Sequence, residues 1–134
     1  MTTRIAVIGA TGYTALELLK ILSRHPDADV IIATSRQEDN SSIQDVHPSL
    51  TNSFDLPLTQ LDVETIGSEV DFAFSCLPHA ASANTVRDLL RDGVKVVDFS
   101  ADYRLNDAVV YEKWYGVEHP DRERLGSVPY GLPE

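Results

Sequence analysis

Residues 5–22 read IAVIGATGYTALELLKIL, and this stretch decides the fold. An apolar run from Ile5 to Ile8 stops at Gly9, and a helical pattern with alanine and leucine on one face begins just after Gly12. A buried strand, a glycine turn and an amphipathic helix in this order build a cradle for phosphate. The helix points its free N–H groups and the positive end of its dipole at an anion. The spacing is a relative of the full dinucleotide fingerprint, and the alternative is that both glycines only shape the turn.

The rest of the chain repeats the alternation of apolar runs and helical patterns. The predicted strands are Arg4–Ile8, Val30–Thr34, Val70–Cys76 and Lys95–Phe99, with a weaker one at Leu56–Leu61. The predicted helices are Gly12–Ser23, Ala81–Arg91 and Ala108–Tyr115, and the polar section Gln37–Thr59 is expected to be a long loop. Strands that are apolar throughout and separated by helices indicate an α/β, Rossmann-like, doubly wound fold. We expect a mostly parallel sheet with helices on both faces and a ligand at the carboxyl ends of the strands.

Composition limits the partners of the chain. Its 134 residues suffice for one domain, with 43% hydrophobic and 24% charged residues. A formal net charge of −10 argues against nucleic acid and against an anionic membrane surface. No apolar run is long enough to span a membrane, and the N-terminus does not read as a signal peptide. Cys76 is the single cysteine, which excludes an internal disulfide and fits a cytoplasmic location.

The end of the second predicted strand carries the residues that choose between cofactors. An acidic residue here would accept hydrogen bonds from the ribose of NAD, but the chain has Ser35 and Arg36. The planar guanidinium of Arg36 suits a 2′-phosphate, with Ser35 as a neutral partner, so the sequence predicts NADP(H). Glu38 and Asp39 lie close by and could instead contact the ribose, and a solvated arginine is the plain alternative.

The fourth predicted strand runs into Ser75, Cys76, Leu77, Pro78 and His79. Leu77 and Pro78 are expected to pack beside the bound dinucleotide while backbone groups approach it. Cys76 has apolar neighbours, so we interpret it as a small core residue rather than a nucleophile. His79 could orient a ligand or cap the following helix, and the sequence does not separate these roles.

Polar residues follow the fifth predicted strand directly. Because unpaired buried polar groups are costly, Asp98, Ser100 and Asp102 are expected to be hydrogen-bonded. Arg104 is a candidate anion clamp, either for a substrate phosphate or for an internal carboxylate such as Asp102. No metal site is predicted, because extended loops fit the three histidines that precede prolines, His25, His47 and His119.

Several further motifs carry a resemblance to a known family. They are GATGYTALELL, TSRQ, DVHPSL at residues 45–50, FSCLPHAAS, VVDFSADYRL, YEKWYGVEHP and YGLPE. With them, the chain resembles the N-terminal, NADP-binding part of the N-acetyl-gamma-glutamyl-phosphate reductases of arginine biosynthesis, over essentially its whole length. The related family to exclude is aspartate-semialdehyde dehydrogenase, which shares the architecture and the chemistry.

The resemblance implies NADPH-dependent reduction of a small-molecule acyl phosphate to an aldehyde, through a thioester on a cysteine. In this family that cysteine lies in an Asn-Pro-Gly-Cys stretch after YGLPE, so Cys76 does not inherit the role. The resemblance assigns cofactor contacts to Gly9, Thr11, Gly12, Tyr13, Thr14, Ser35, Arg36, Ser75, Leu77, Pro78 and His79, and substrate binding to Arg104. Ala15 and Ala81 depart from the family pattern, and both are small enough that we expect altered cofactor contact at most.

We therefore expect residues 1–134 to be an NAD(P)-binding domain, inactive alone and forming the N-terminal part of a longer, two-domain, homo-oligomeric enzyme. The chain reaches Glu134 without a closing structural element, which favours this interpretation. The alternative from another functional class is a stand-alone dinucleotide-binding sensor or interaction module.

Overall fold

A computed structural model describes residues 1–36 and 41–131 of the chain. Its centre is one sheet of five parallel strands in the order β3-β2-β1-β4-β5. The strands are β1 (Thr3–Ile8), β2 (Ala28–Thr34), β3 (Leu58–Thr59), β4 (Phe72–Ser75) and β5 (Lys95–Asp98). The helices are α1 (Tyr13–Leu22), α2 (Ile43–Val46), α3 (Val63–Glu69), α4 (Ser82–Arg91) and α5 (Ala108–Tyr115). The predicted α/β doubly wound fold is confirmed, and within the described residues every strand pairing is parallel.

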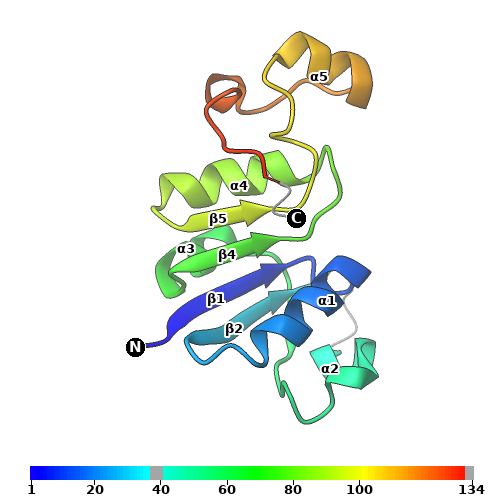
Figure 1. Cartoon of the computed structure of the whole chain (residues 1–134), viewed down its shortest axis with the longest axis vertical. Coiled ribbons are helices and arrows are strands. Elements are labelled where there is room, and N and C mark those ends of the chain that lie inside the picture. The colour runs from blue at the N-terminus through cyan, green and yellow to red at the C-terminus, as the bar shows by residue number, and fades with distance from the viewer. Residues whose placement is uncertain (37–40, 132–134) are drawn as a thin grey trace.

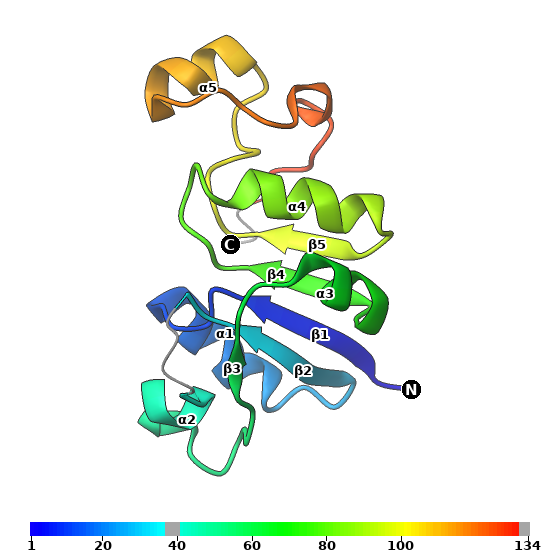
Figure 2. The ribbon, with the colours of Figure 1, turned by 180° about the vertical axis from the view of Figure 1, so that it is seen from behind.

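Helices cover both faces of the sheet, as its apolar strands require. In β1, Ile5 and Val7 point into a core shared with α1, whereas Ala6 and Ile8 point into a second core shared with α3 and α4. Figure 1 shows α1 in front of the sheet, and Figure 2 shows α3 and α4 on the opposite side. Alternation of apolar side chains between two buried faces explains why β1 is hydrophobic at consecutive positions.

The strand order reverses at β1, which pairs with β2 on one side and β4 on the other. The loops that follow β1 and β4 therefore diverge at the carboxyl edge of the sheet. Open α/β sheets bind ligands in the crevice at such a switch point. This topology brings together the residues that the sequence placed at separate strand ends.

The section predicted as a long loop has more regular structure than expected. Residues 43–46 form α2, a 3₁₀ turn covers Pro48–Leu50, and Ile43 and Leu50 are buried in the core beneath α1. Leu58 and Thr59 add the short edge strand β3, where a weak strand was expected. Phe54, Leu56 and Leu58 of the same segment pack partly buried against this core. The two fully buried apolar residues are too few to produce a periodic pattern.

Helix α3 was missed because Gly67 interrupts its sequence and three of its residues are β-branched. The glycine has a packing reason, since a Cβ there would lie 2.6 Å from a carboxylate oxygen of Asp92. The helix begins at a regular N-cap, where the Asp62 carboxylate accepts hydrogen bonds from the N–H groups of Glu64 and Thr65. That cap was the available signal in the sequence.

Candidate dinucleotide-binding site

Two glycines in the loop between β1 and α1 serve different purposes. Gly9 has φ of +77°, and a Cβ there would lie 3.0 Å from the Cys76 carbonyl oxygen, so backbone conformation and packing both require glycine. This contact joins the loops after β1 and β4 at the switch point. Gly12 has an ordinary φ of −84°, and apart from its neighbours in sequence no atom of the described residues lies within 4 Å of the position of a Cβ. Neither the backbone nor the surrounding protein demands a glycine at position 12.

Gly12 leaves the N-terminus of α1 open. It is the N-cap residue, and no side chain caps the helix. Thr11, Tyr13 and Thr14 beside it are all exposed. The amide N–H groups and the positive dipole end of α1 are therefore accessible to an anion, and the missing side chain leaves room for its close approach. These residues fit the diphosphate of a dinucleotide.

Two buried side chains hold the glycine loop. Thr34, at the end of β2, accepts hydrogen bonds from Gly9 N–H at its Oγ1 (3.2 Å) and from Ala10 N–H at its carbonyl (2.8 Å). His47 approaches from the segment after α2, with its Nε2 2.7 Å from the Ala10 carbonyl oxygen. Because it precedes a proline, His47 was expected only in an extended loop, and the long-range bond to Ala10 left no local signal in the sequence.

Ser35 and Arg36 follow β2, next to the glycine loop, as predicted. Ser35 is buried, and its N–H donates to the Thr59 carbonyl at 2.9 Å, which fixes the start of the following turn. Arg36 is exposed and has no ion pair with any residue in the described part of the chain. Glu38 and Asp39, the alternative ribose contacts, lie outside the described residues.

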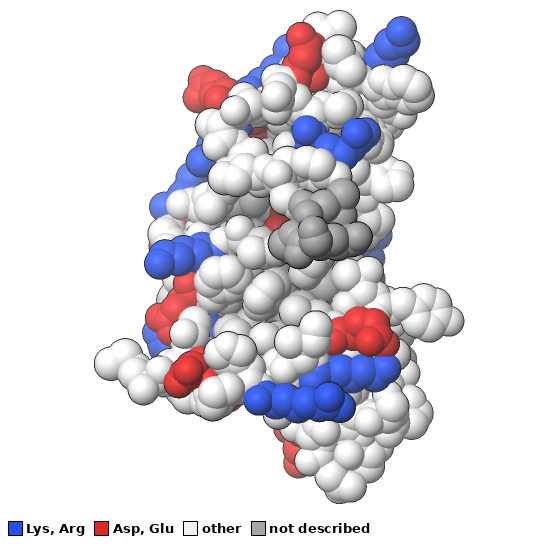
Figure 3. Space-filling model, in the orientation of Figure 1, with Lys and Arg blue, Asp and Glu red and all other residues white. Residues whose placement is uncertain are grey.

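Charge on the visible face gives no general attraction to anions. Figure 3 shows lysine and arginine in small groups that alternate with aspartate and glutamate. The formal net charge of −10 acts in the same direction. An anionic cofactor would therefore depend on local donors such as Arg36 and the open amides of α1.

The β4–α4 loop presents a mixed surface to the switch point. Leu77 is half-buried against Gly9, while Pro78 and His79 are exposed and lie beside it in sequence. The His79 ring packs at 5.4 Å, centroid to centroid, from that of Tyr115 of α5. Ser75 differs from these residues, because it is fully buried with its Oγ 2.7 Å from Ser82 Oγ. Its hydroxyl thus belongs to the packing between β4 and α4, and a cofactor contact by Ser75 stays a prediction.

Asp102 caps α4 from a distant loop. Its fully buried carboxylate accepts hydrogen bonds from the N–H groups of Ala80 (2.7 Å), Ser82 (3.1 Å) and Ala83 (2.8 Å). The Tyr111 hydroxyl donates to the same carboxylate at 2.8 Å. Ala80 has φ of +65°, a strained conformation for a residue with a side chain, and Asp102 helps to hold it there.

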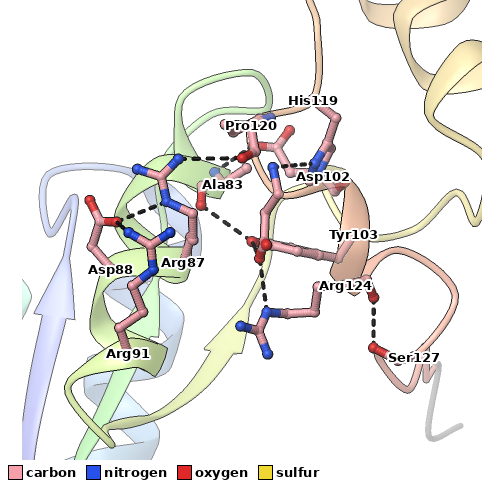
Figure 4. Close-up of polar contacts among 11 residues, drawn as sticks. Ala83, Arg87, Asp88, Arg91, Asp102, Tyr103, His119, Pro120, Arg124 and Ser127 are labelled. Atoms are coloured by element: carbon pink, nitrogen blue, oxygen red, sulfur yellow. Dashed lines mark hydrogen bonds and ion pairs between the residues drawn. The ribbon is translucent and has the colours of Figure 1, made fainter.

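Further hydrogen bonds connect the loop that carries Asp102 to the residues that follow α5 (Figure 4). His119 donates from Nε2 to the Asp102 carbonyl at 2.8 Å. The Tyr103 hydroxyl lies 3.2 Å from the Ala83 carbonyl and 2.9 Å from an Asp121 carboxylate oxygen. The segment around α5 is therefore a support for the N-terminus of α4.

The polar residues after β5 are hydrogen-bonded, as expected. Asp98 accepts from Ser82 Oγ at 2.8 Å and from both the N–H (2.9 Å) and hydroxyl (2.8 Å) of Ser100. Burial raises the pKa of Asp98, although these hydrogen bonds oppose the shift. Arg104 does not pair with Asp102, so that alternative was wrong. Its guanidinium donates to the Tyr115 hydroxyl at 3.1 Å and remains exposed.

Cys76 has the properties of a packing residue. It is half-buried against the core beneath α1. Burial, with a smaller contribution from the charge of Asp98, raises the pKa of its thiol to about 11. A thiol with this pKa is protonated at neutral pH and is a poor nucleophile. The described residues contain no group of three or more side chains placed to hold a metal ion.

Comparison with known proteins agrees with this geometry. N-acetyl-gamma-glutamyl-phosphate reductases match nearly the whole chain, with 48% identity in Rhodopirellula baltica over 98% of the chain and 43% in Methanopyrus kandleri over 97%. A [LysW]-L-2-aminoadipate/[LysW]-L-glutamate phosphate reductase of Sulfurisphaera tokodaii is 43% identical over 98% of the chain. The resemblance expected from the sequence is confirmed, although the chain spans only about 38% of the length of each of these relatives.

Solved structures share the fold at low sequence identity. Aspartate semialdehyde dehydrogenase of Candida albicans with NADP superposes with a TM-score of 0.62 at 19% identity, covering 90% of this chain and 41% of that one. The Vibrio cholerae aspartate semialdehyde dehydrogenase II gives 0.63 at 20% identity, covering 78% and 30%. The sequence profile of the semialdehyde dehydrogenase NAD-binding domain matches residues 4–134. With the switch-point site in place, this match shows that the chain belongs to the semialdehyde dehydrogenase NAD-binding domain family.

Proposed function

We propose that this chain binds NADP(H) at the switch point and is the cofactor-binding part of an N-acetyl-gamma-glutamyl-phosphate reductase. The reaction is the reduction of N-acetyl-glutamyl 5-phosphate to the 5-semialdehyde, with release of phosphate. The observation that carries the cofactor assignment is the uncapped N-terminus of α1 at Gly12, where the described residues leave room for a ligand. The relative of that name at 48% identity supports the choice of substrate, whereas at 43% identity one relative carries that name and another is named a [LysW]-L-2-aminoadipate/[LysW]-L-glutamate phosphate reductase.

Each part of the cofactor has residues that suit it. Residues 11–14 are exposed at the start of α1 and their amides would hold the diphosphate, while Gly9 permits the close approach of the two loops. The exposed guanidinium of Arg36, beside Ser35, would bind the 2′-phosphate by paired hydrogen bonds. The surface of Leu77, Pro78 and His79 would lie beside the nicotinamide.

The chain would place the hydride donor and part of the substrate site on one edge of the sheet. NADPH, when bound, would supply the hydride. Arg104, held by the Tyr115 hydroxyl, would attract the acidic or phosphate group of the substrate. Cys76 does not provide the nucleophile, because its thiol pKa is raised to about 11. We propose that residues 1–134 alone do not turn over and that the thiol lies outside them.

The wider setting follows from the same assignment. We propose that residues 1–134 are the N-terminal, NAD(P)-binding domain of a longer polypeptide that forms a homo-oligomer in the cytoplasm. Its substrate would be a small acyl phosphate. Within the described residues, no helix has the length and apolar character needed to cross a membrane.

Calorimetric titration with NADP⁺ and NAD⁺ tests the cofactor assignment. We expect tighter binding of NADP⁺, and we expect Arg36→Ala to weaken NADP⁺ binding by about tenfold to a hundredfold, as for a lost charged hydrogen-bonded pair. Affinity for NAD⁺ should stay the same in this variant. Equal affinity of the wild-type chain for both dinucleotides would contradict the 2′-phosphate site, and reductase turnover by residues 1–134 alone would contradict the proposed inactivity.

A further inference from the structure

His47 makes a buried hydrogen bond to the glycine loop from a segment that is distant from it in sequence. The side chain is 6% exposed, and its Nε2 lies 2.7 Å from the Ala10 carbonyl oxygen. A carbonyl can only accept, so Nε2 carries the proton and donates. The bond spans 37 residues of sequence, and therefore fixes the loop relative to the body of the domain.

This bond sets the direction of the next amide group. The peptide unit between Ala10 and Thr11 is planar and trans, so its N–H points opposite to its C=O. With the Ala10 carbonyl turned inward to His47, the Thr11 N–H faces the other way, on the exposed side of the loop. This N–H has no hydrogen-bond acceptor among residues 1–36 and 41–131.

His47 is itself held by the core. Ile43 and Leu50, on either side of it in sequence, are 0% and 2% exposed and pack beneath α1. Ser42 and Asp45 form a reciprocal capping box that starts the short helix before it. The imidazole position is therefore set by packing and needs no ligand.

We propose that His47 is a positioning residue that aims the Thr11 amide at the diphosphate of the cofactor before binding. This inference rests on the proposed dinucleotide function and adds the group that preorganises the site. Preorganisation raises affinity because the ordering of the loop is complete before the ligand arrives. The sequence placed His47 in the DVHPSL segment and gave it no role.

Two substitutions of His47 separate loss of the hydrogen bond to Ala10 from a change in side-chain size. In His47→Gln the side-chain amide nitrogen reaches the place of Nε2 and can donate to Ala10, whereas in His47→Asn it falls short. We expect His47→Asn to weaken NADP⁺ binding about tenfold, as for one lost hydrogen bond, and His47→Gln to stay within about twofold of wild type. His25→Asn is the matched control, since His25 is exposed and, within the described residues, its imidazole accepts a hydrogen bond only from the N–H of Asp27.

The choice of ligands distinguishes positioning from a general loss of structure. Adenosine 2′-monophosphate carries the 2′-phosphate and lacks the diphosphate, so its affinity should change little in His47→Asn. Equal weakening of both ligands, or unchanged NADP⁺ affinity, would overturn the role of His47. Failure of the wild-type chain to bind either ligand would overturn the proposed function itself.

Amide NMR of the wild-type chain tests the inference without any substitution. The Thr11 N–H resonance should shift when NADP⁺ is added and stay in place when adenosine 2′-monophosphate is added. A Thr11 resonance that does not respond to NADP⁺ would overturn the proposal even if His47→Asn does not fold.

Discussion

Helices α1 and α4 begin at the same edge of the sheet and differ at their N-termini. Each has ten residues, and each follows a loop with a positive φ, at Gly9 and at Ala80. The N-terminus of α4 is closed, because the Asp102 carboxylate accepts from three backbone N–H groups there. The N-terminus of α1 has no side-chain cap and faces open space at Gly12.

This difference shows how the fold separates support from binding. Both helix ends attract negative charge through the same dipole and the same unpaired donors. At α4 the protein supplies that charge itself, and the result is a fixed loop. At α1 none of the described residues places a carboxylate on the helix N-terminus. The proposed cofactor diphosphate would supply the negative charge there, as Asp102 does at α4.

Removal of the internal carboxylate should have the largest effect. In Asp102→Asn the side-chain NH₂ replaces one acceptor oxygen and faces backbone N–H groups that then lack partners. We expect the free energy of unfolding to fall by about 3 kcal/mol, since each unsatisfied buried donor costs about 1–3 kcal/mol. Urea denaturation measures this change.

The matched substitution is Asp107→Asn at the exposed N-cap of α5. There one carboxylate oxygen accepts from both Val109 N–H (2.8 Å) and Val110 N–H (3.1 Å). Asparagine and aspartate are similar N-caps, so we expect a change below about 0.5 kcal/mol. Equal losses at Asp102 and Asp107 would mean that Asp102 is an ordinary cap and that α4 is not specially closed.

Closing α1 in the manner of α4 gives the next largest effect. Gly12→Asp places a carboxylate at an N-cap with extended backbone and free space around it. We expect the unfolding free energy to rise by about 0.5 kcal/mol. We also expect NADP⁺ affinity to fall at least about a hundredfold, since like charges in contact cost several kcal/mol.

Gly12→Ala separates the charge of the new side chain from its bulk. Alanine fills the same space without a charge and without a capping oxygen, so it should weaken NADP⁺ binding less than aspartate and should not stabilise the fold. Thermal unfolding and calorimetry on both variants give the two quantities. Undiminished NADP⁺ binding in Gly12→Asp would show that the open end of α1 is not the diphosphate site.

The open N-terminus of α1 was easier to predict from the sequence than the capped N-terminus of α4. The strand, the glycines and the helix around Gly12 are contiguous, so local pattern revealed them. The capping of α4 joins Asp102 to Ala80, Ser82 and Ala83 across about twenty residues, and no periodicity records such a bond. Asp102 was expected to be hydrogen-bonded, but its donors became visible only in three dimensions.

His47 and the segment around it illustrate the same limit. Polar composition predicted a loop, and its buried apolar residues, Ile43 and Leu50, were too sparse to show a pattern. Histidine before proline was interpreted as extended backbone, yet His47 and His119 are both buried donors to distant carbonyls, whereas His25 is exposed. Sequence spacing describes a residue's neighbours along the chain, and these roles depend on neighbours in space.

The smallest expected effect is a loss of stability in acid, through protonation of Asp121 in the segment that supports α4. Asp121 supports the Tyr103 hydroxyl that reaches Ala83 of α4. Burial alone would raise the pKa of Asp121, but hydrogen bonds from Arg124 and Tyr103 hold it below its ordinary value. A lowered pKa in the folded state contributes stability above the unfolded pKa of about 3.9, and this contribution is lost as the pH falls through the lower folded value.

Stability measured against pH in wild type and in Asp121→Asn isolates this contribution. The variant should be less stable at neutral pH, and the difference between the two proteins should shrink as the pH falls below about 4. Asp98, whose pKa burial raises, has the opposite pH dependence, but both proteins carry it, so it cancels in the difference. A stability difference between the two proteins that does not change with pH would contradict this role of the Asp121 carboxylate.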